Sequence, residues 1–112
     1  MAAFLVCSEH AKVRAFNIIR KEEQQLMEKL YQATLEKWGE EAQYDQAVEE
    51  CAELIAALKH FRRGKIERHV VIDELADVTL MLGQLTWMFG EDQVKSAVET
   101  KLAKLQKLLN QA

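Results

Sequence analysis

The chain has 112 residues, 49% hydrophobic and 29% charged, with a formal net charge of -3. This length accommodates one domain and excludes a two-domain enzyme, and the composition is that of a folded chain. Net negative charge disfavours sequence-independent binding to a nucleic-acid polymer, and no apolar run is long enough for a membrane span.

The chain contains no proline and only two cysteines. Proline is the commonest helix breaker, so its absence predicts long helices. Cys7 and Cys51 are far apart, and neither has a companion at zinc-binding spacing, so neither a zinc site nor a disulfide framework is indicated. Reduced thiols and the lack of a targeting signal favour a cytoplasmic protein.

Glycines at positions 39, 64 and 90 predict helix ends, because glycine readily adopts left-handed backbone angles there. The first predicted helix covers residues 11–38, either unbroken or broken near residue 20. The second covers residues 42–63. Its apolar stripe consists of Val48, Cys51, Ile55 and Leu58.

The third predicted helix, residues 68–89, is apolar on every side, so we expect it to be buried on every side. The fourth, residues 91–109, carries a stripe with near-heptad spacing and should pack along another helix. Short connections favour antiparallel neighbours. We therefore predict an all-α single domain over residues 1–112, an antiparallel bundle of four to five helices. A single small domain does not have enough chain to bury the helix at 68–89 on every side, so we expect a homo-oligomer, either a homodimer or a homotetramer.

Acidic residues occupy an unexpected place in the third helix. Glu74 and Asp77 lie in its apolar sequence, where an ionised carboxylate must be paired, protonated or bound to a metal. Residues three apart share a helix face, so these two carboxylates can converge. Glu50 and Glu53 repeat this spacing on the second helix.

Two such helices packed antiparallel would place four carboxylates around one cavity. Hard divalent cations prefer oxygen ligands, so this arrangement predicts Mg²⁺, with Mn²⁺ as a substitute. A di-iron centre would require Glu-x-x-His motifs, and alanine and aspartate stand where the histidines would be. The alternative is that each pair is a solvated charge pair or a set of first-turn acids that complement a helix dipole.

These residues resemble the MazG-like all-α nucleoside triphosphate pyrophosphohydrolase superfamily, whose signature is Glu-Glu-x-x-Glu followed by Glu-x-x-Asp. Residues 49–53 match the first half and residues 74–77 the second, and the likeness covers residues 26–109 but not 1–20. It implies Mg²⁺-dependent cleavage of nucleoside triphosphates between the α and β phosphates. In this resemblance the catalytic set is Glu49, Glu50, Glu53, Glu74 and Asp77. The last four would hold the metal, and Glu49 would activate water, act as a ligand or remain a surface charge.

Basic residues between the two motifs are candidates for contacting phosphates, namely Lys59, Arg62 and Arg68. Their alternative role is to complement the dipole at a helix end. Lys101 and Lys104 resemble residues that reach phosphates in relatives, and they equally fit a solvated edge beside a leucine stripe. The lysine that some relatives carry shortly before the second motif is missing here.

The sequence thus predicts a nucleotide-pool house-cleaning enzyme that binds nucleoside triphosphates. Two other enzyme activities fit the same motifs: a phosphoribosyl-ATP pyrophosphohydrolase and a dUTPase-like member of the superfamily. An alternative of another class is a non-catalytic, metal-binding helical interaction module. No nucleic-acid polymer or membrane partner is expected.

Overall fold

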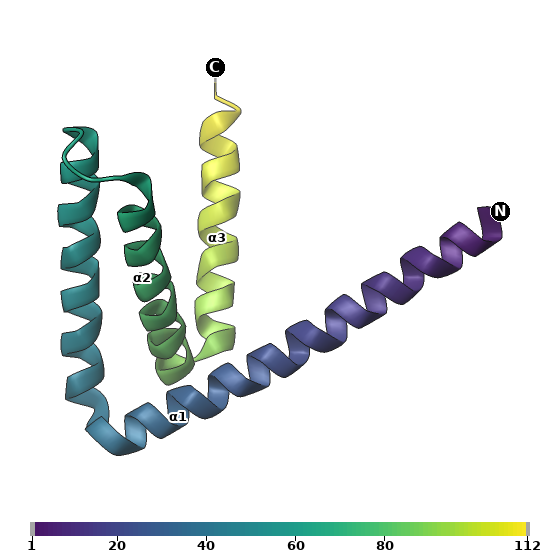
Figure 1. Ribbon diagram of the computed structural model, residues 1–112, viewed down its shortest axis with the longest axis horizontal. Helices are drawn as coiled ribbons and strands as arrows, with labels where there is room; N and C mark the ends of the chain where they lie inside the picture. The colour runs from purple at the N-terminus through teal and green to yellow at the C-terminus, as the bar shows by residue number, and fades with distance from the viewer. Residues whose placement is uncertain (1, 112) are drawn as a thin grey trace. The chain divides into compact units, whose positions relative to one another are not determined.

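The computed structural model describes the backbone of residues 2–111 and the side chains of residues 20–111. It contains three helices, α1 (Ala2–Arg62), α2 (Arg68–Phe89) and α3 (Glu91–Leu109) (Figure 1). No strand occurs among the described residues, so the all-α prediction is confirmed. Three helices stand where four to five were predicted, because the first two predicted helices meet at a kink with no loop between them.

Gly39 marks the expected boundary as a kink inside α1. Its backbone angles, φ 85° and ψ 171°, lie outside the helical region and are readily adopted only by glycine. Helical structure resumes directly after it, so the boundary bends α1 without ending it. The expected alternative of a break near Arg20 is not observed, since the described backbone is helical from Ala2 to the kink.

The chain divides into two compact units, Met1–Lys37 and Trp38–Ala112. The described part of the first unit is residues 2–37 of α1. The second contains the rest of α1 together with α2 and α3, and it carries all the residues of both acidic motifs. None of the described helices is long and apolar enough to span a membrane.

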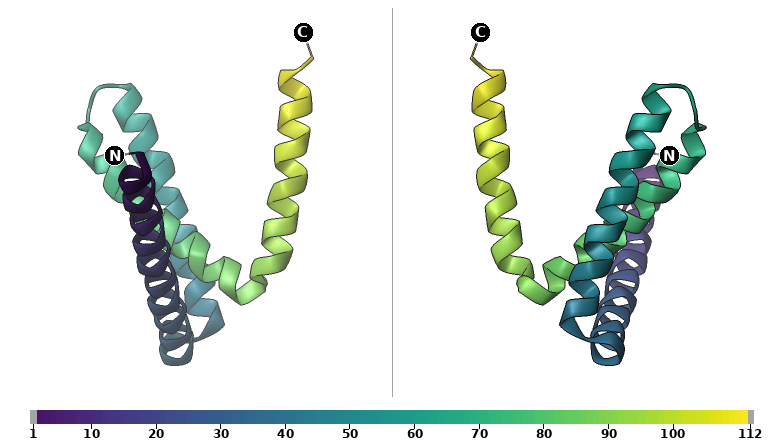
Figure 2. Two further views of the ribbon diagram at one scale, coloured as in Figure 1. Left: turned by 90° about the vertical axis from the view of Figure 1, so that its right-hand side faces the viewer. Right: turned by 90° about the vertical axis from the view of Figure 1, so that its left-hand side faces the viewer.

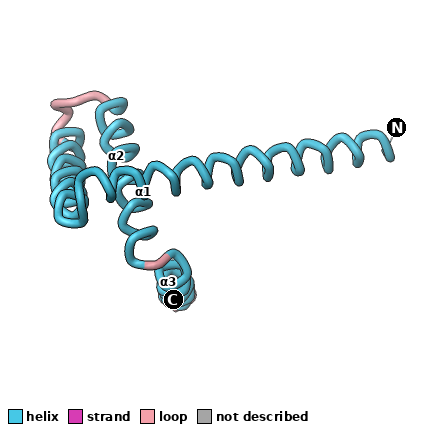
Figure 3. Tube along the Cα trace, turned by 90° about the horizontal axis from the view of Figure 1, so that it is seen from below, coloured by secondary structure: helices cyan, strands magenta, loops and turns pink. Residues whose placement is uncertain are grey.

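Within the second unit, α2 runs antiparallel to the part of α1 that follows the kink. The rings of Tyr44, early in that part, and Phe89, the last residue of α2, lie 6.0 Å apart. The intervening turn begins with hydrogen bonds from the Gly64 amide to the Phe61 carbonyl, at 3.0 Å, and from the Lys65 amide to the His60 carbonyl, also at 3.0 Å. The helix pair is therefore a hairpin, visible in Figure 3 with its connecting turn in pink.

The hairpin packs through a face of small and polar residues. The buried residues on this part of α1 are Gln43, Ala47 and Ala57, and those on α2 are Val78 and Gln84. Alanines in the contact face allow two helix backbones to approach closely. The half-buried Glu50 and Leu54 of α1 lie on the same face as its alanines.

The larger apolar residues lie mostly outside this contact face. Val48 and Ile55 of the predicted α1 stripe are 69% and 59% exposed, and Leu75 and Leu82 of α2 are also about half exposed. The single chain therefore covers α2 only in part, and burial of α2 on every side, which was expected to require a second subunit, stays a prediction. Close packing uses the alanine-bearing face of α1, and that face can cover only one side of α2.

Gly90 alone connects α2 to α3, with φ 123° and ψ 109°. Its amide donates to the Thr86 carbonyl and its carbonyl accepts from the Val94 amide, both at 3.0 Å. Figure 2 shows that α3 turns away at this point, so that its far end stands apart from the hairpin. No residue of α3 is buried, so no other helix described in the single chain encloses it, and its expected packing along another helix stays a prediction.

Candidate metal centre

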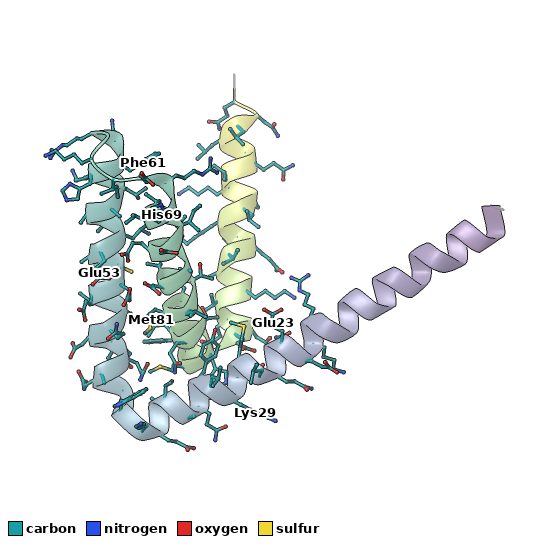
Figure 4. All side chains as sticks on the ribbon, in the orientation of Figure 1. Glu23, Lys29, Glu53, Phe61, His69 and Met81 are labelled. Carbon is teal, nitrogen blue, oxygen red and sulfur yellow. The ribbon has the colours of Figure 1, made fainter. Side chains whose placement is uncertain are left out.

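Four carboxylates from the two arms of the hairpin meet at its centre. One oxygen from each of Glu50, Glu53, Glu74 and Asp77 lies within 4.8 Å of the corresponding oxygen of every other member. We call these four residues the acidic cluster. The acidic cluster can be located in Figure 4 from Glu53, which is labelled about midway along the hairpin. The spacing of three residues puts each pair on one helix face, and antiparallel packing turns the two faces toward each other.

The acidic cluster is half enclosed. Glu50 and Glu74 are partly buried in the helix contact, whereas Glu53 and Asp77 are exposed at its edge. Oε2 of Glu50 and Oε2 of Glu74 are shielded from water and accept no hydrogen bond within the described part of the chain. Carboxylate oxygens buried without partners are costly, so the arrangement lacks a cationic or proton-donating group at this point.

The pKa values of two of these carboxyls are raised by their surroundings. Partial removal from water raises the pKa of the Glu50 carboxyl above its ordinary value of 4.5, and the charges of Glu53, Asp77 and Glu49 raise it further. The pKa of Glu53 is also raised, first by desolvation and then by the charges of Glu74 and Glu49. The neighbouring charges therefore disfavour ionisation of Glu50 and Glu53, and a divalent cation would relieve this repulsion.

Gln46 opposes this trend at Glu50. Its side-chain amide donates a 2.7 Å hydrogen bond to Oε1 of Glu50, which lowers the pKa of that carboxyl and fixes its orientation. Sequence reasoning missed this residue. The available signal was its position four residues before Glu50, which places the two side chains next to each other on a helix.

The structure disfavours the reading of the second motif as a set of first-turn acids. The helix begins at Arg68 and has no acidic residue in its first turn, so Glu74 lies too far along to complement the dipole there. None of the four carboxylates forms an ion pair with a basic side chain among the described residues. No basic side chain within residues 20–111 thus compensates the negative charge of the acidic cluster.

Glu49 lies beside the acidic cluster but outside it. Its side chain is exposed, and its charge acts on both Glu50 and Glu53. Glu49 precedes Glu53 by four residues, so the two side chains are neighbours on the helix surface. The position of Glu49 is also one in which a simple surface charge would be found.

The predicted phosphate contacts fall into two groups. Lys59 and Arg62, with Arg63, line an open cavity of about 240 Å³ at the end of α1. Lys59 follows Glu53 by six residues, which is about 9 Å along the helix axis. Arg68 is exposed at the start of α2. Lys101 and Lys104 are exposed on the outer half of α3, which Figure 2 shows apart from the hairpin, so the single chain does not bring them to the acidic cluster.

Comparisons with protein-family models, with curated proteins and with solved structures found no match to this chain.

Proposed function

We propose that the chain is a Mg²⁺-dependent nucleoside triphosphate pyrophosphohydrolase of the MazG-like type. The observation that carries this proposal is the convergence of Glu50, Glu53, Glu74 and Asp77 within 4.8 Å. These residues constitute the motifs that carry the resemblance, and they come from two helices that the fold brings together. Their all-oxygen donor set suits Mg²⁺, and Mn²⁺ can substitute.

The fit to a divalent cation rests on the two shielded oxygens of Glu50 and Glu74, which lack any partner among the described residues. The four carboxylates would hold Mg²⁺, with Glu53 and Asp77 on the side open to solvent and substrate. Bound Mg²⁺ supplies charge neutralisation at the phosphates and lowers the pKa of a bound water. Without it, the acidic cluster repels a triphosphate.

The protein's own residues position the reactants. Glu49, exposed beside Glu50 and Glu53, orients or deprotonates the water that attacks the α phosphate. Lys59 and Arg62 lie beyond Glu53 on the same helix and would contact phosphate oxygens left uncovered by metal. Breaking the bond between the α and β phosphates yields a nucleoside monophosphate and pyrophosphate.

The test is pyrophosphate release from a panel of canonical and modified nucleoside triphosphates, with Mg²⁺ and with a chelator. Glu53→Gln should abolish turnover, because it removes a ligand charge from the acidic cluster. Asp73→Asn is the matched control, since Asp73 is exposed on α2, lies outside the acidic cluster and carries the same charge. Full activity in the Glu53 variant would remove this residue from the mechanism.

The same assay separates the alternatives. Turnover of phosphoribosyl-ATP alone would identify the corresponding pyrophosphohydrolase, and turnover confined to dUTP a dUTPase-like enzyme. A non-catalytic interaction module would be stabilised by Mg²⁺ and release no pyrophosphate from any substrate. Each of these results would replace the broad house-cleaning activity proposed above.

We also propose that the chain works as a homodimer or homotetramer in the cytoplasm. The support for self-association is the large number of apolar side chains left exposed on α1, α2 and α3. A surface of this kind on a folded chain commonly marks a protein interface.

A further inference from the structure

One side of α3 is apolar along its whole length. We call the residues Val94, Val98, Leu102, Leu105 and Leu109 the α3 stripe; they lie on one side of the helix at spacings of three and four. Val94 is partly covered, and the other four are about half exposed or more, reaching 77% at Leu109. Helices in proteins gain most of their stability by packing an amphipathic face against a partner, so we expect α3 to have a partner along this face.

The α3 stripe is nearly symmetric about Leu102. Val94 and Val98 lie eight and four residues before it, and Leu105 and Leu109 lie three and seven residues after it. Two copies of α3 placed antiparallel therefore set Val94 against Leu109 and Val98 against Leu105. Each smaller side chain then faces a larger one. A parallel pair would instead place valine against valine at one end and leucine against leucine at the other.

The charges of α3 favour the same orientation. Glu91, Asp92 and Glu99 make the first half acidic with one lysine among them, whereas the basic residues of the second half are Lys101, Lys104 and Lys107, with no acid after Glu99. An antiparallel pair lays the acidic half of one helix beside the basic half of the other. A parallel pair brings like charges together along its whole length.

We propose that the α3 stripe binds the α3 stripe of a second copy of this chain, antiparallel and centred near Leu102. This inference specifies the interface of the self-association proposed above, and it does not depend on the catalytic function. The acidic cluster lies on α1 and α2, so α3 can be altered without changing its residues.

The first experiment measures molar mass in solution by sedimentation at about 100 μM protein, a concentration that reveals even weak association. In the full chain, Leu102→Gln together with Leu105→Gln should halve the molar mass, because glutamine preserves helix formation but not the apolar face. Ala103→Gln is the matched control, an exposed residue on the opposite side of α3 whose substitution should leave the mass unchanged. An equal mass for the double variant and the wild type, or a monomeric wild type, would overturn the proposal.

The second experiment tests orientation by disulfide formation and does not depend on a destabilising change. In a background with Cys7→Ala and Cys51→Ala, chains with Val98→Cys are mixed with chains carrying Leu105→Cys. Antiparallel pairing should give the mixed cross-link. The Val98 variant alone should not cross-link, because its two sites would be about 10 Å apart along the axis, beyond disulfide reach.

Cross-linking of the Val98 variant with itself would show a parallel pair and overturn the proposal. A halved mass in the double variant without the mixed cross-link would show that α3 docks on a different surface of the second copy, which also overturns it. Because neither experiment uses a nucleotide, failure here is distinct from failure of the proposed activity.

Discussion

Ala57 offers the sharpest test of how the fold builds the acidic cluster. Its side chain is buried, 6% exposed, on the α1 face that packs against α2, four residues after Glu53. Ala57→Leu adds three carbon atoms to this contact. Overpacking of this size costs about 1–3 kcal/mol. For a small domain, each kcal/mol lowers the melting temperature by about 4–8 °C.

The same change should also weaken Mg²⁺ binding, because forcing the helices apart separates Glu53 from Glu74. Ala56→Leu is the control: Ala56 adjoins Ala57 but is exposed, so the same added volume meets no neighbour. Its effect on stability should remain within about 0.5 kcal/mol. Thermal unfolding and calorimetric Mg²⁺ titration measure both effects. Equal stability and equal Mg²⁺ affinity in the two variants would refute the idea that close packing at Ala57 sets the carboxylate spacing.

Three further predictions concern stability. Because the pKa values of Glu50 and Glu53 are raised in the metal-free folded chain, these two carboxyls keep their protons to higher pH than in the unfolded chain. Their contribution to the free energy of unfolding should therefore fall as pH rises from about 4.5 through the raised pKa values, and level off above them. Denaturant titrations at a series of pH values measure this dependence, and Glu53→Gln should make the free energy of unfolding less dependent on pH. A free energy of unfolding that rises with pH over this range would contradict the prediction. Mg²⁺ at 100 times its dissociation constant should stabilise the chain by about 2.7 kcal/mol. Glu74→Gln should reduce the stabilisation at the same Mg²⁺ concentration. A melting temperature that does not change when Mg²⁺ is added would show that the proposed site is absent. Gly64 has a φ of 69° and open space around it, so an added side chain is disfavoured by the backbone angle and not by a clash. Gly64→Ala should lower the free energy of unfolding by about 1–2 kcal/mol, and Gly64→Asn by less, because asparagine tolerates this angle better. Chemical unfolding measures both, and equal values for the two variants would show that the backbone angle is not retained.

Local signals in the sequence located the helices and the carboxylates well. The predicted ranges 68–89 and 91–109 coincide with α2 and α3, because Gly64 and Gly90 end helical patterns that no proline interrupts. The convergence of Glu50, Glu53, Glu74 and Asp77 was also predictable. It needed only the three-residue spacing and an antiparallel hairpin.

Sequence reasoning failed on which helix faces are buried. The stripe through Val48 and Ile55 carries the larger apolar residues, yet the residues buried on this part of α1 are Gln43, Ala47 and Ala57, on a different face. Helical periodicity shows that a face is apolar without showing which partner covers it. Two helices in close contact favour small side chains, and the larger residues stay available for contacts outside the single chain.

The direction of α3 is determined by one residue. With Gly90 as the whole connection, no loop absorbs an added or deleted amino acid. One residue inserted after Gly90 would rotate α3 by about 100° around its own axis. The leucines would then face a new direction while the carboxylates on α1 and α2 kept their places. Among relatives of this chain, a change in length at this point would therefore be a direct route to a different assembly around the same acidic centre.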